Sequence, residues 1–245
     1  MTSAESSYAQ FTEAGYRELL RLAKGRYAFR SFRDYRDAPA GTVLWRHDLD
    51  FSVHRALAVA RIEAAEGVHA THFLLLHSGF YNALEAEVAE RVREIVSFGH
   101  DLGLHFDPRF YDGRDLDDAL ARERALLEDL FATEVTAFSL HNPDIAGWSD
   151  GRDEIAGMVN AYGSYLTQHY GYASDSNGYW RFAPLDEVLV RDNEERLQVL
   201  THPEWWVPEP MSPRERVARA IDGRARRQHA RYDEIMKAMR RENVR

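Results

Sequence analysis

The sequence contains no cysteine among its 245 residues. A disulfide framework and a thiolate metal site are therefore excluded, and any metal ion must be held by histidine, aspartate or glutamate. No apolar run approaches the roughly 20 residues that are needed to span a bilayer. Residues 1–10 are polar and lack the basic flank and apolar stretch of a secretion signal. We therefore expect a cytoplasmic protein that does not bind a membrane.

The sequence also has fewer basic than acidic residues, with 31 lysines and arginines against 40 aspartates and glutamates. The net charge is −9, which argues against general binding of nucleic acid through its phosphates. The charge is uneven, since residues 212–245 carry +6 and residues 1–211 carry −15. We expect the basic tail to be a solvated helix face or to dock on the acidic body, in preference to binding nucleic acid or a protein partner. No pattern in the sequence indicates an oligomeric state.

The chain alternates between apolar strand patterns and helical patterns. Its hydrophobic content of 44% is sufficient for a substantial core. After a leading helix at 11–23, we expect strands at 43–45, 70–76, 101–106, 135–140 and 197–201, and helices at 52–66, 83–98, 115–131, 154–159 and about 212–243. This rhythm predicts one α/β domain over residues 1–245, with a parallel sheet in a core of about 40–205 and ligands at the carboxyl ends of the strands.

The first candidate site lies where an apolar run ends in Arg-His-Asp-Leu-Asp. On a strand, Asp48 and Asp50 point to the same side. Two carboxylates on one side repel each other unless a cation or a shared proton relieves them, so a metal site is the first hypothesis. The alternative is that an aspartate caps the helix that follows.

Polar groups follow four of the expected strands, and in a barrel or an open parallel sheet such ends converge on one rim. These groups are His47, Asp48 and Asp50; His105 and Asp107; His141 and Asn142; and His202 and Glu204. We expect the remaining histidines to be structural or exposed; they are His54, His69, His72, His77, His100, His169 and His229. Gly103 lies on the same strand face as His105, and we expect it to leave space there for a ligand.

The motifs taken in order resemble the polysaccharide deacetylase family, also called the NodB-homology or carbohydrate esterase 4 family. The resemblance rests on residues 44–50, 70–74, 99–105 and 199–203. It implies a distorted (β/α)7 barrel, here with an N-terminal helix and a long C-terminal helix. It also implies a divalent metal ion, most simply zinc, and removal of acetyl groups from N-acetylated sugars.

The resemblance also implies roles for individual residues. Asp48 resembles the catalytic base and Asp50 a metal ligand, although the family places this pair side by side and here a leucine separates them. His105 resembles the first histidine of a His-x-x-x-His metal pair, whose second position is Arg109, and arginine cannot bind a metal.

The remaining motifs supply a replacement ligand and an acid. His141, where the family has Arg-Pro-Pro, is the candidate for the missing ligand. His202 resembles the histidine that protonates the leaving amine, and Asp175 and Trp180 resemble the motif that supports it. If Asp48 were instead a second metal ligand, Asp107 or Glu204 would have to be the base.

The sequence thus predicts a metal-dependent hydrolase that acts on an N-acylated sugar or a related small precursor. An aspartate and two histidines leave open positions on a zinc-like ion, where water can ionise near neutral pH. Arg109 could bind an anionic group of the substrate, and Trp180 and Trp205 could pack on a sugar. Other aromatic candidates for a sugar-binding rim are Phe80, Tyr81, Phe110, Tyr111, Trp148 and Trp206. The alternatives are a non-catalytic relative that binds glycans or a partner, and a metal hydrolase of another amide or an ester.

Overall fold

The structure is a computed structural model that describes residues 8–111, 114–143, 150–191 and 193–244. Its strands are β1 (Ala28–Phe29), β2 (Thr42–Leu49), β3 (Thr71–Leu75), β4 (Asp101–Phe106), β5 (Ala137–Leu140), β6 (Glu154–Ile155), β7 (Met158–Asn160), β8 (Gly171–Ser174) and β9 (Arg196–Thr201). Its helices are α2 (Glu13–Lys24), α3 (Val53–Glu66), α4 (Ala86–Ser97), α5 (Leu116–Phe131), α7 (Ser164–His169), α8 (Leu185–Arg191) and α9 (Pro213–Ala238). Short 3₁₀ turns are η1 (Phe32–Asp34), η2 (Pro108–Tyr111), η3 (Ser176–Gly178) and η4 (Pro203–Trp205).

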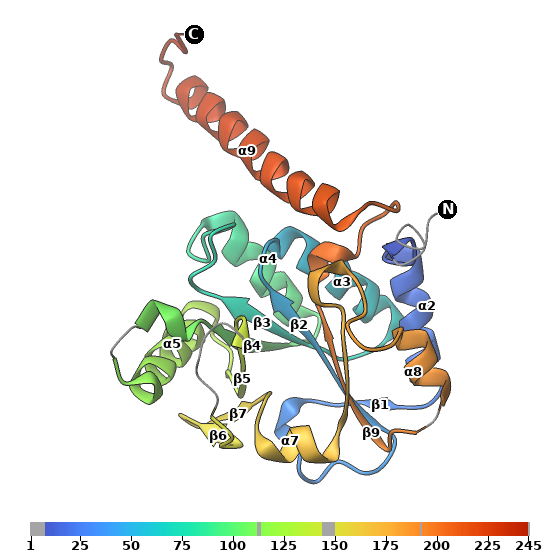
Figure 1. The fold of residues 1–245 in the computed structure, drawn as a ribbon. Coiled ribbons are helices and arrows are strands. Elements are labelled where there is room, and N and C mark those ends of the chain that lie inside the picture. The colour runs from blue at the N-terminus through green and yellow to red at the C-terminus, as the bar shows by residue number, and fades with distance from the viewer. Residues whose placement is uncertain (1–7, 112–113, 144–149, 192, 245) are drawn as a thin grey trace.

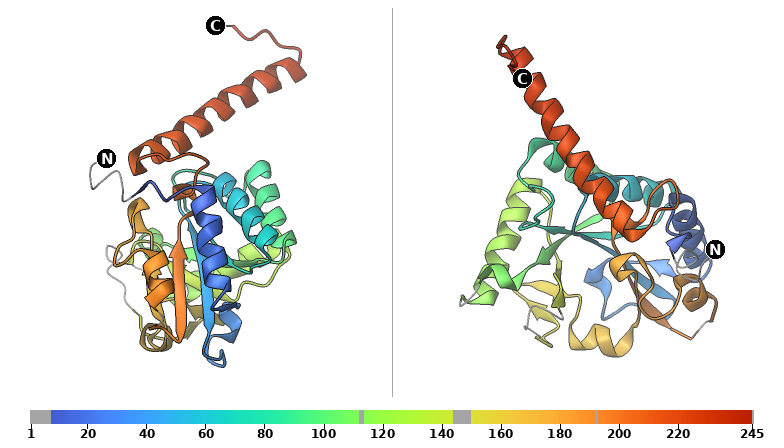
Figure 2. Two further views of the ribbon diagram at one scale, coloured as in Figure 1. Left: turned by 90° about the vertical axis from the view of Figure 1, so that its right-hand side faces the viewer. Right: turned by 45° about the horizontal axis from the view of Figure 1, so that its top comes forward.

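The strands form one curled sheet in the order β6-β7-β5-β4-β3-β2-β9-β8, and β1 pairs with the start of β2. From β7 to β8 every neighbouring pair is parallel. Helices cover the outside of the curl, and α9 extends away from the body (Figures 1 and 2). The predicted barrel type is confirmed: among the described residues, seven strands from β7 to β8 form the parallel curl, and β1 adds a short parallel pair on β2. Within the described residues no ladder joins β8 to β6 or β7, so the sheet remains an open half-barrel.

Local sequence signals set most element boundaries. The hydroxyl of Ser52 accepts a hydrogen bond from the Arg55 amide and caps α3, which ends at Gly67 in the left-handed conformation with φ 66°. Ser212 and Glu215 form a capping box at the start of α9. These boundaries agree with the predicted helix starts and ends.

The predicted helix at 154–159 is wrong. Residues 154–160 instead form the antiparallel pair β6 and β7, joined by Ala156 (φ 52°) and Gly157 (φ 72°). Two central residues with positive φ make the tight turn that matches the twist of a hairpin, and glycine adopts such a φ without strain. Gly157 was the signal for this turn.

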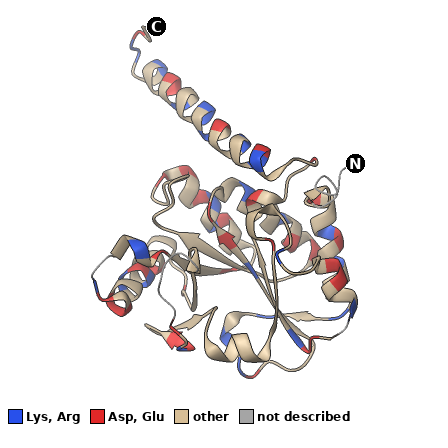
Figure 3. Cartoon of the chain, viewed as in Figure 1, with Lys and Arg blue, Asp and Glu red and all other residues tan. Residues whose placement is uncertain are grey.

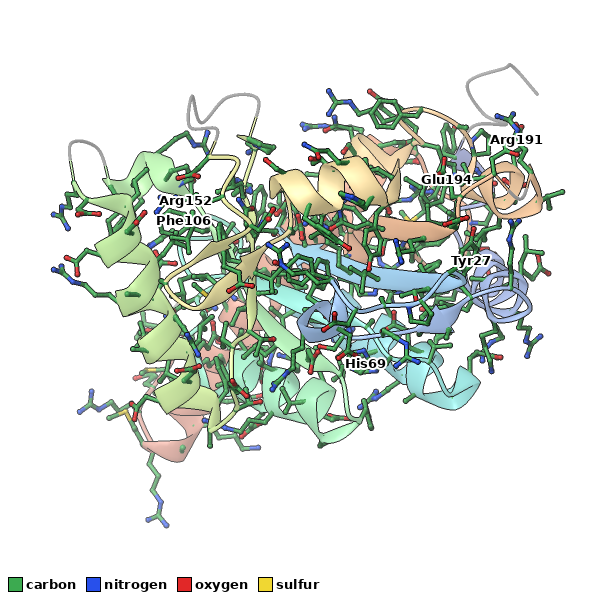
Figure 4. All side chains as sticks on the ribbon, turned by 90° about the horizontal axis from the view of Figure 1, so that it is seen from below. Tyr27, His69, Phe106, Arg152, Arg191 and Glu194 are labelled. Atoms are coloured by element: carbon green, nitrogen blue, oxygen red, sulfur yellow. The ribbon has the colours of Figure 1, made fainter. Side chains whose placement is uncertain are left out.

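Structural contacts hold the amino-terminal ends of the strands, which lie opposite to their carboxyl ends. The Tyr27 hydroxyl donates a hydrogen bond to the carbonyl of Glu194 at 2.9 Å, and both residues lie at this end in Figure 4. His69 lies at the same end, with Nε2 3.4 Å from Asp101 Oδ2. This position agrees with the prediction that His69 is a structural histidine. Within the described part of the chain, no helix is long and apolar enough to cross a membrane.

Candidate metal centre and catalytic cleft

The carboxyl ends of the parallel strands surround a cleft of about 910 Å³. It is lined by residues that follow β2, β4, β5 and β9, as the sequence predicts for a parallel sheet. Asp48, Asp50, His105, His141 and His202 all line it. Five of the predicted catalytic and metal-binding residues are therefore brought together.

Three of these side chains direct one ligand atom each towards a common point. His105 Nε2 lies 3.0 Å from Asp50 Oδ1 and 3.2 Å from His141 Nδ1, and His141 Nδ1 lies 3.4 Å from Asp50 Oδ1. Two ligands that are each about 2.1 Å from one ion, at about 90° to 110°, lie about 3.0 to 3.4 Å apart. The triangle therefore has the dimensions of three ligands that share one metal ion.

The environment of Asp50 also fits a cation. Its Oδ1 is buried and has no hydrogen-bond partner among the described residues. An anionic oxygen that is buried without a donor is the kind of group that a metal ion stabilises.

A serine fixes the orientation of His105. Ser139 Oγ lies 2.7 Å from His105 Nδ1 and donates a hydrogen bond to Asp48 Oδ1 at 3.0 Å. Because that hydroxyl proton is directed to Asp48, Ser139 accepts the Nδ1–H of His105. The Nε2 lone pair then faces Asp50 and His141, as metal binding requires. Ser139 was not predicted as a site residue.

A second unpredicted residue, Arg46, lies next to Asp48. Residues 46, 48 and 50 alternate along the end of β2, so their side chains share one face. Arg46 is fully buried, its Nη2 is 3.8 Å from Asp48 Oδ2, and it donates to the Tyr162 hydroxyl at 2.8 Å. Burial by itself would lower the pKa of Arg46, but Asp48 raises it above the usual range. Arg46 therefore places a buried positive charge next to the carboxyl group of Asp48.

His202 faces the metal triangle from β9. Its Nδ1 lies 2.7 Å from Asp175 Oδ1, and its Nε2 is 3.9 Å from Asp50 Oδ2. Asp175 also accepts the backbone N–H of His202. Burial by itself would lower the pKa of His202, but Asp175 raises it well above its usual range. Asp175 thus favours the protonated form of His202, and Nε2 lies on the side of the cleft and Asp50.

The predicted substrate-binding residues divide into two groups. Arg109 and Trp205 line the cleft, although the Arg109 guanidinium is hydrogen-bonded to both oxygens of Asp107, at 2.9 and 2.8 Å. Trp180 does not line the cleft: its ring stacks on Phe11 at 5.3 Å. Trp180 is therefore a packing residue in this structure, because its ring lies against Phe11 and Trp206.

Other expectations need correction. Gly103 makes room for a neighbouring ring and not for a ligand, because a Cβ there would lie 2.4 Å from the ring of Phe73 on β3. Glu204, an alternative base, lines a different hollow. His77, expected to be structural or exposed, lies 2.8 Å from Glu123 through Nε2 and also lines the cleft. Trp148 lies outside the described residues.

A second group of histidines lies on the other face of β2. His47 Nε2 is 2.6 Å from Glu63 Oε1, and His72 Nε2 is 3.1 Å from Glu63 Oε2. The Tyr16 hydroxyl donates to Glu63 at 2.6 Å. These are hydrogen-bond lengths around a fully buried carboxylate, and they connect α2 and α3 to the sheet. His72 is a structural histidine in this arrangement, as predicted.

Comparisons with known proteins find solved structures that are similar to this chain in fold. No family profile matches the chain, and no curated protein matches it in sequence. The Streptococcus pyogenes deacetylase PplD, solved in complex with acetate, is similar over 84% of each chain, with 16% identity and a TM-score of 0.40.

Two further solved structures, both named as members of esterase family 4, are similar. One is a pseudoenzyme from Bacillus anthracis, with 14% identity and a TM-score of 0.40, over 76% of this chain and 60% of the other. The other is an acetyl xylan esterase from Clostridium thermocellum, solved with a cobalt ion, with 14% identity and a TM-score of 0.37, over 76% and 84%. The roles of the site residues in this chain depend on its own geometry.

Proposed function

We propose that this protein is a metal-dependent hydrolase that removes an acyl group, such as acetyl, from an N-acylated sugar or a related small precursor. The observation that carries the proposal is the triangle of Asp50, His105 and His141. Beside it lie a carboxylate, Asp48, and a histidine acid, His202. This combination of a ligand set, a base and an acid is what hydrolysis of an amide requires.

The residues divide the reaction between them. Asp50, His105 and His141 would hold a divalent ion, most simply zinc. Such an ion would polarise the acyl carbonyl and make water a better nucleophile. Asp48 accepts the proton of the attacking water as the C–O bond forms, and Arg46 stabilises its charge. His202 then donates its Nε2 proton to the nitrogen as the C–N bond breaks, while Asp175 holds the imidazolium in place.

The shape of the cleft supports a small sugar-like substrate. Its volume of about 910 Å³ lies within the range of small-molecule sites. Phe51, Phe80, Tyr172 and Trp205 line it, and flat aromatic faces pack well against sugar rings. The substrate class is therefore proposed from an aromatic rim around a hydrolytic centre.

Acetate release tests the proposal. The zinc-loaded and the metal-free proteins would each be incubated with N-acetylated monosaccharides, sugar phosphates, sugar nucleotides and short oligosaccharides. We expect zinc-dependent release from at least one class, and His202→Asn should lower kcat by about 10² to 10⁴, the usual contribution of a general acid. Arg122→Gln, an exposed change on α5, is the control. Absence of acetate from every substrate would contradict the proposal, and release from esters alone would identify an esterase.

A further inference from the structure

A second hollow, here called the arginine pocket, lies between α9 and the N-terminal ends of α3 and α4. Its volume is about 390 Å³, and its walls include Val53, Val88, Arg219 and Gly223. Phe51 and Phe80, with ring centres 4.2 Å apart, line both this pocket and the catalytic cleft. One pair of aromatic rings thus separates the two spaces. A pocket of this size accommodates a small ligand.

The arginine pocket has an excess of positive charge. Seven arginines and three glutamates line it. Glu85 is paired with Arg224 at 3.0 Å, and Glu87 with Arg227. Burial raises the pKa of the third, Glu204, well above its usual range. Blue segments, which mark lysine and arginine, recur along α9 (Figure 3). The glutamates therefore leave several arginines of the pocket without an opposing charge.

Arg216 is the buried member of this set. Its side chain is only 2% exposed, and Nη2 donates to the carbonyl of Tyr8 at 3.0 Å. Its Nε and Nη1 have no hydrogen-bond partner among the described residues, and no carboxylate there pairs with Arg216, Arg219 or Arg226. Buried N–H donors without an acceptor are costly, and an anionic ligand would satisfy them.

Gly223 is the second observation that indicates a ligand. It lies in the interior of α9, where glycine costs roughly 1 kcal/mol relative to alanine. A Cβ at this position would meet nothing within 4 Å, so neighbouring side chains do not require a glycine. The space that it leaves belongs to the arginine pocket. An unfilled position on the wall of a charged pocket is consistent with a bound molecule.

The start of α3 adds to the positive potential. Ser52, Val53 and His54 line the pocket, and the first turn of this 14-residue helix contains no acidic residue. The N-terminal end of a helix carries partial positive charge and binds anions. Burial, followed by Arg91 and Arg55, lowers the pKa of His54. The arginines are therefore close enough to disfavour another cation in this region.

We propose that the arginine pocket binds a phosphoryl group, as a phosphate monoester or a diphosphate on a small molecule. Guanidinium groups form paired hydrogen bonds with phosphate oxygens, and several arginines with a helix end suit an anion of more than one charge. The group belongs either to a substrate whose acylated part reaches the cleft past Phe51 and Phe80 or to a separate ligand. Both sources share the same chemistry at the arginine pocket.

Binding of inorganic pyrophosphate to the full-length, metal-free protein tests the proposal by calorimetry. Metal is removed so that the probe cannot bind an ion in the cleft, which makes the result independent of the proposed hydrolysis. Arg219→Gln should weaken binding about tenfold or more, since it removes a charge-assisted hydrogen bond. Arg219 is exposed, so this change should leave the fold intact. Arg214→Gln removes the same charge from α9 outside the pocket, and should leave binding unchanged.

A second variant blocks the space without changing the charge. Gly223→Leu places a side chain in the pocket at a helical position with no clash, and should abolish binding while keeping the protein folded. Failure of pyrophosphate to bind, or equal binding by wild type, Arg219→Gln and Gly223→Leu, would overturn the proposal.

The source of the phosphoryl group is resolved by comparing uridine diphosphate with the same nucleotide linked to N-acetylglucosamine. Tighter binding of the sugar nucleotide would support the pocket and assign the phosphoryl group to a substrate. Equal binding of the two would support the pocket and assign the group to a separate ligand. Binding of neither, together with no binding of pyrophosphate, would count against the pocket.

Discussion

Replacing Ser139 by alanine tests how the structure prepares His105 for metal binding. The hydroxyl is buried, and it connects His105 Nδ1 at 2.7 Å to Asp48 Oδ1 at 3.0 Å. Without it, the Nδ1–H of His105 loses its acceptor and Asp48 loses a donor. An outer partner of a histidine ligand typically contributes about 10-fold to 100-fold in metal affinity. A buried polar group left without a partner costs about 1 to 3 kcal/mol.

We therefore expect Ser139→Ala to bind zinc about 10-fold to 100-fold more weakly, measured by competition with a chromogenic chelator. The metal-free variant should also lose about 1 to 3 kcal/mol in its free energy of unfolding in urea. Ser174→Ala is a matched control, because Ser174 is a buried serine whose hydroxyl contacts Ser176 and not a ligand. If Ser139→Ala and Ser174→Ala bind zinc as tightly as wild type, the proposed orientation of His105 is wrong.

Three further substitutions test the roles of Asp175, His72 and Arg109 separately. Asp175→Asn should lower the pKa of His202, so that the upper limb of the pH profile of kcat moves to lower pH while zinc affinity stays within a factor of about two. Burial lowers the pKa of His72 to about 3, so between pH 6.5 and 3 the unfolded chain binds a proton that the folded chain does not. The free energy of unfolding in urea should therefore fall as the pH falls through this window, by about 1.4 kcal/mol per pH unit for each such proton. His72→Gln should reduce this dependence of stability on pH. An unchanged dependence would contradict the assignment of this proton to His72. Arg109→Ala should leave zinc affinity unchanged, because its guanidinium bonds Asp107 and not a ligand; a large loss would show that it supports the site.

The sequence predicted those parts of the fold and site that depend on local patterns. Ser52 and Gly67 delimit α3 through local hydrogen bonds, and the placement of Asp50, His105 and His141 at strand ends follows from parallel strands. His141 was inferred because Arg109 cannot bind a metal, and the structure places it 3.2 Å from His105.

What the sequence could not provide is the pairing of residues between neighbouring strands. Ser139 lies directly across from His105 in the ladder of β4 and β5, and Phe73 lies across from Gly103 in the ladder of β3 and β4. The first pairing supplies an unpredicted site residue, and the second fills space that was assigned to a ligand. A shift of one residue in the first ladder would remove the pairing of Ser139 with His105, and a shift in the second would remove the pairing of Phe73 with Gly103. Register depends on long-range packing.

The most direct test of the metal centre is a crystal structure of the zinc-loaded protein with anomalous data at the zinc edge. The account predicts one peak within about 2.0 to 2.2 Å of Asp50, His105 Nε2 and His141 Nδ1. The absence of a peak there, or a peak at His47, Glu63 and His72 alone, would contradict the proposed metal centre.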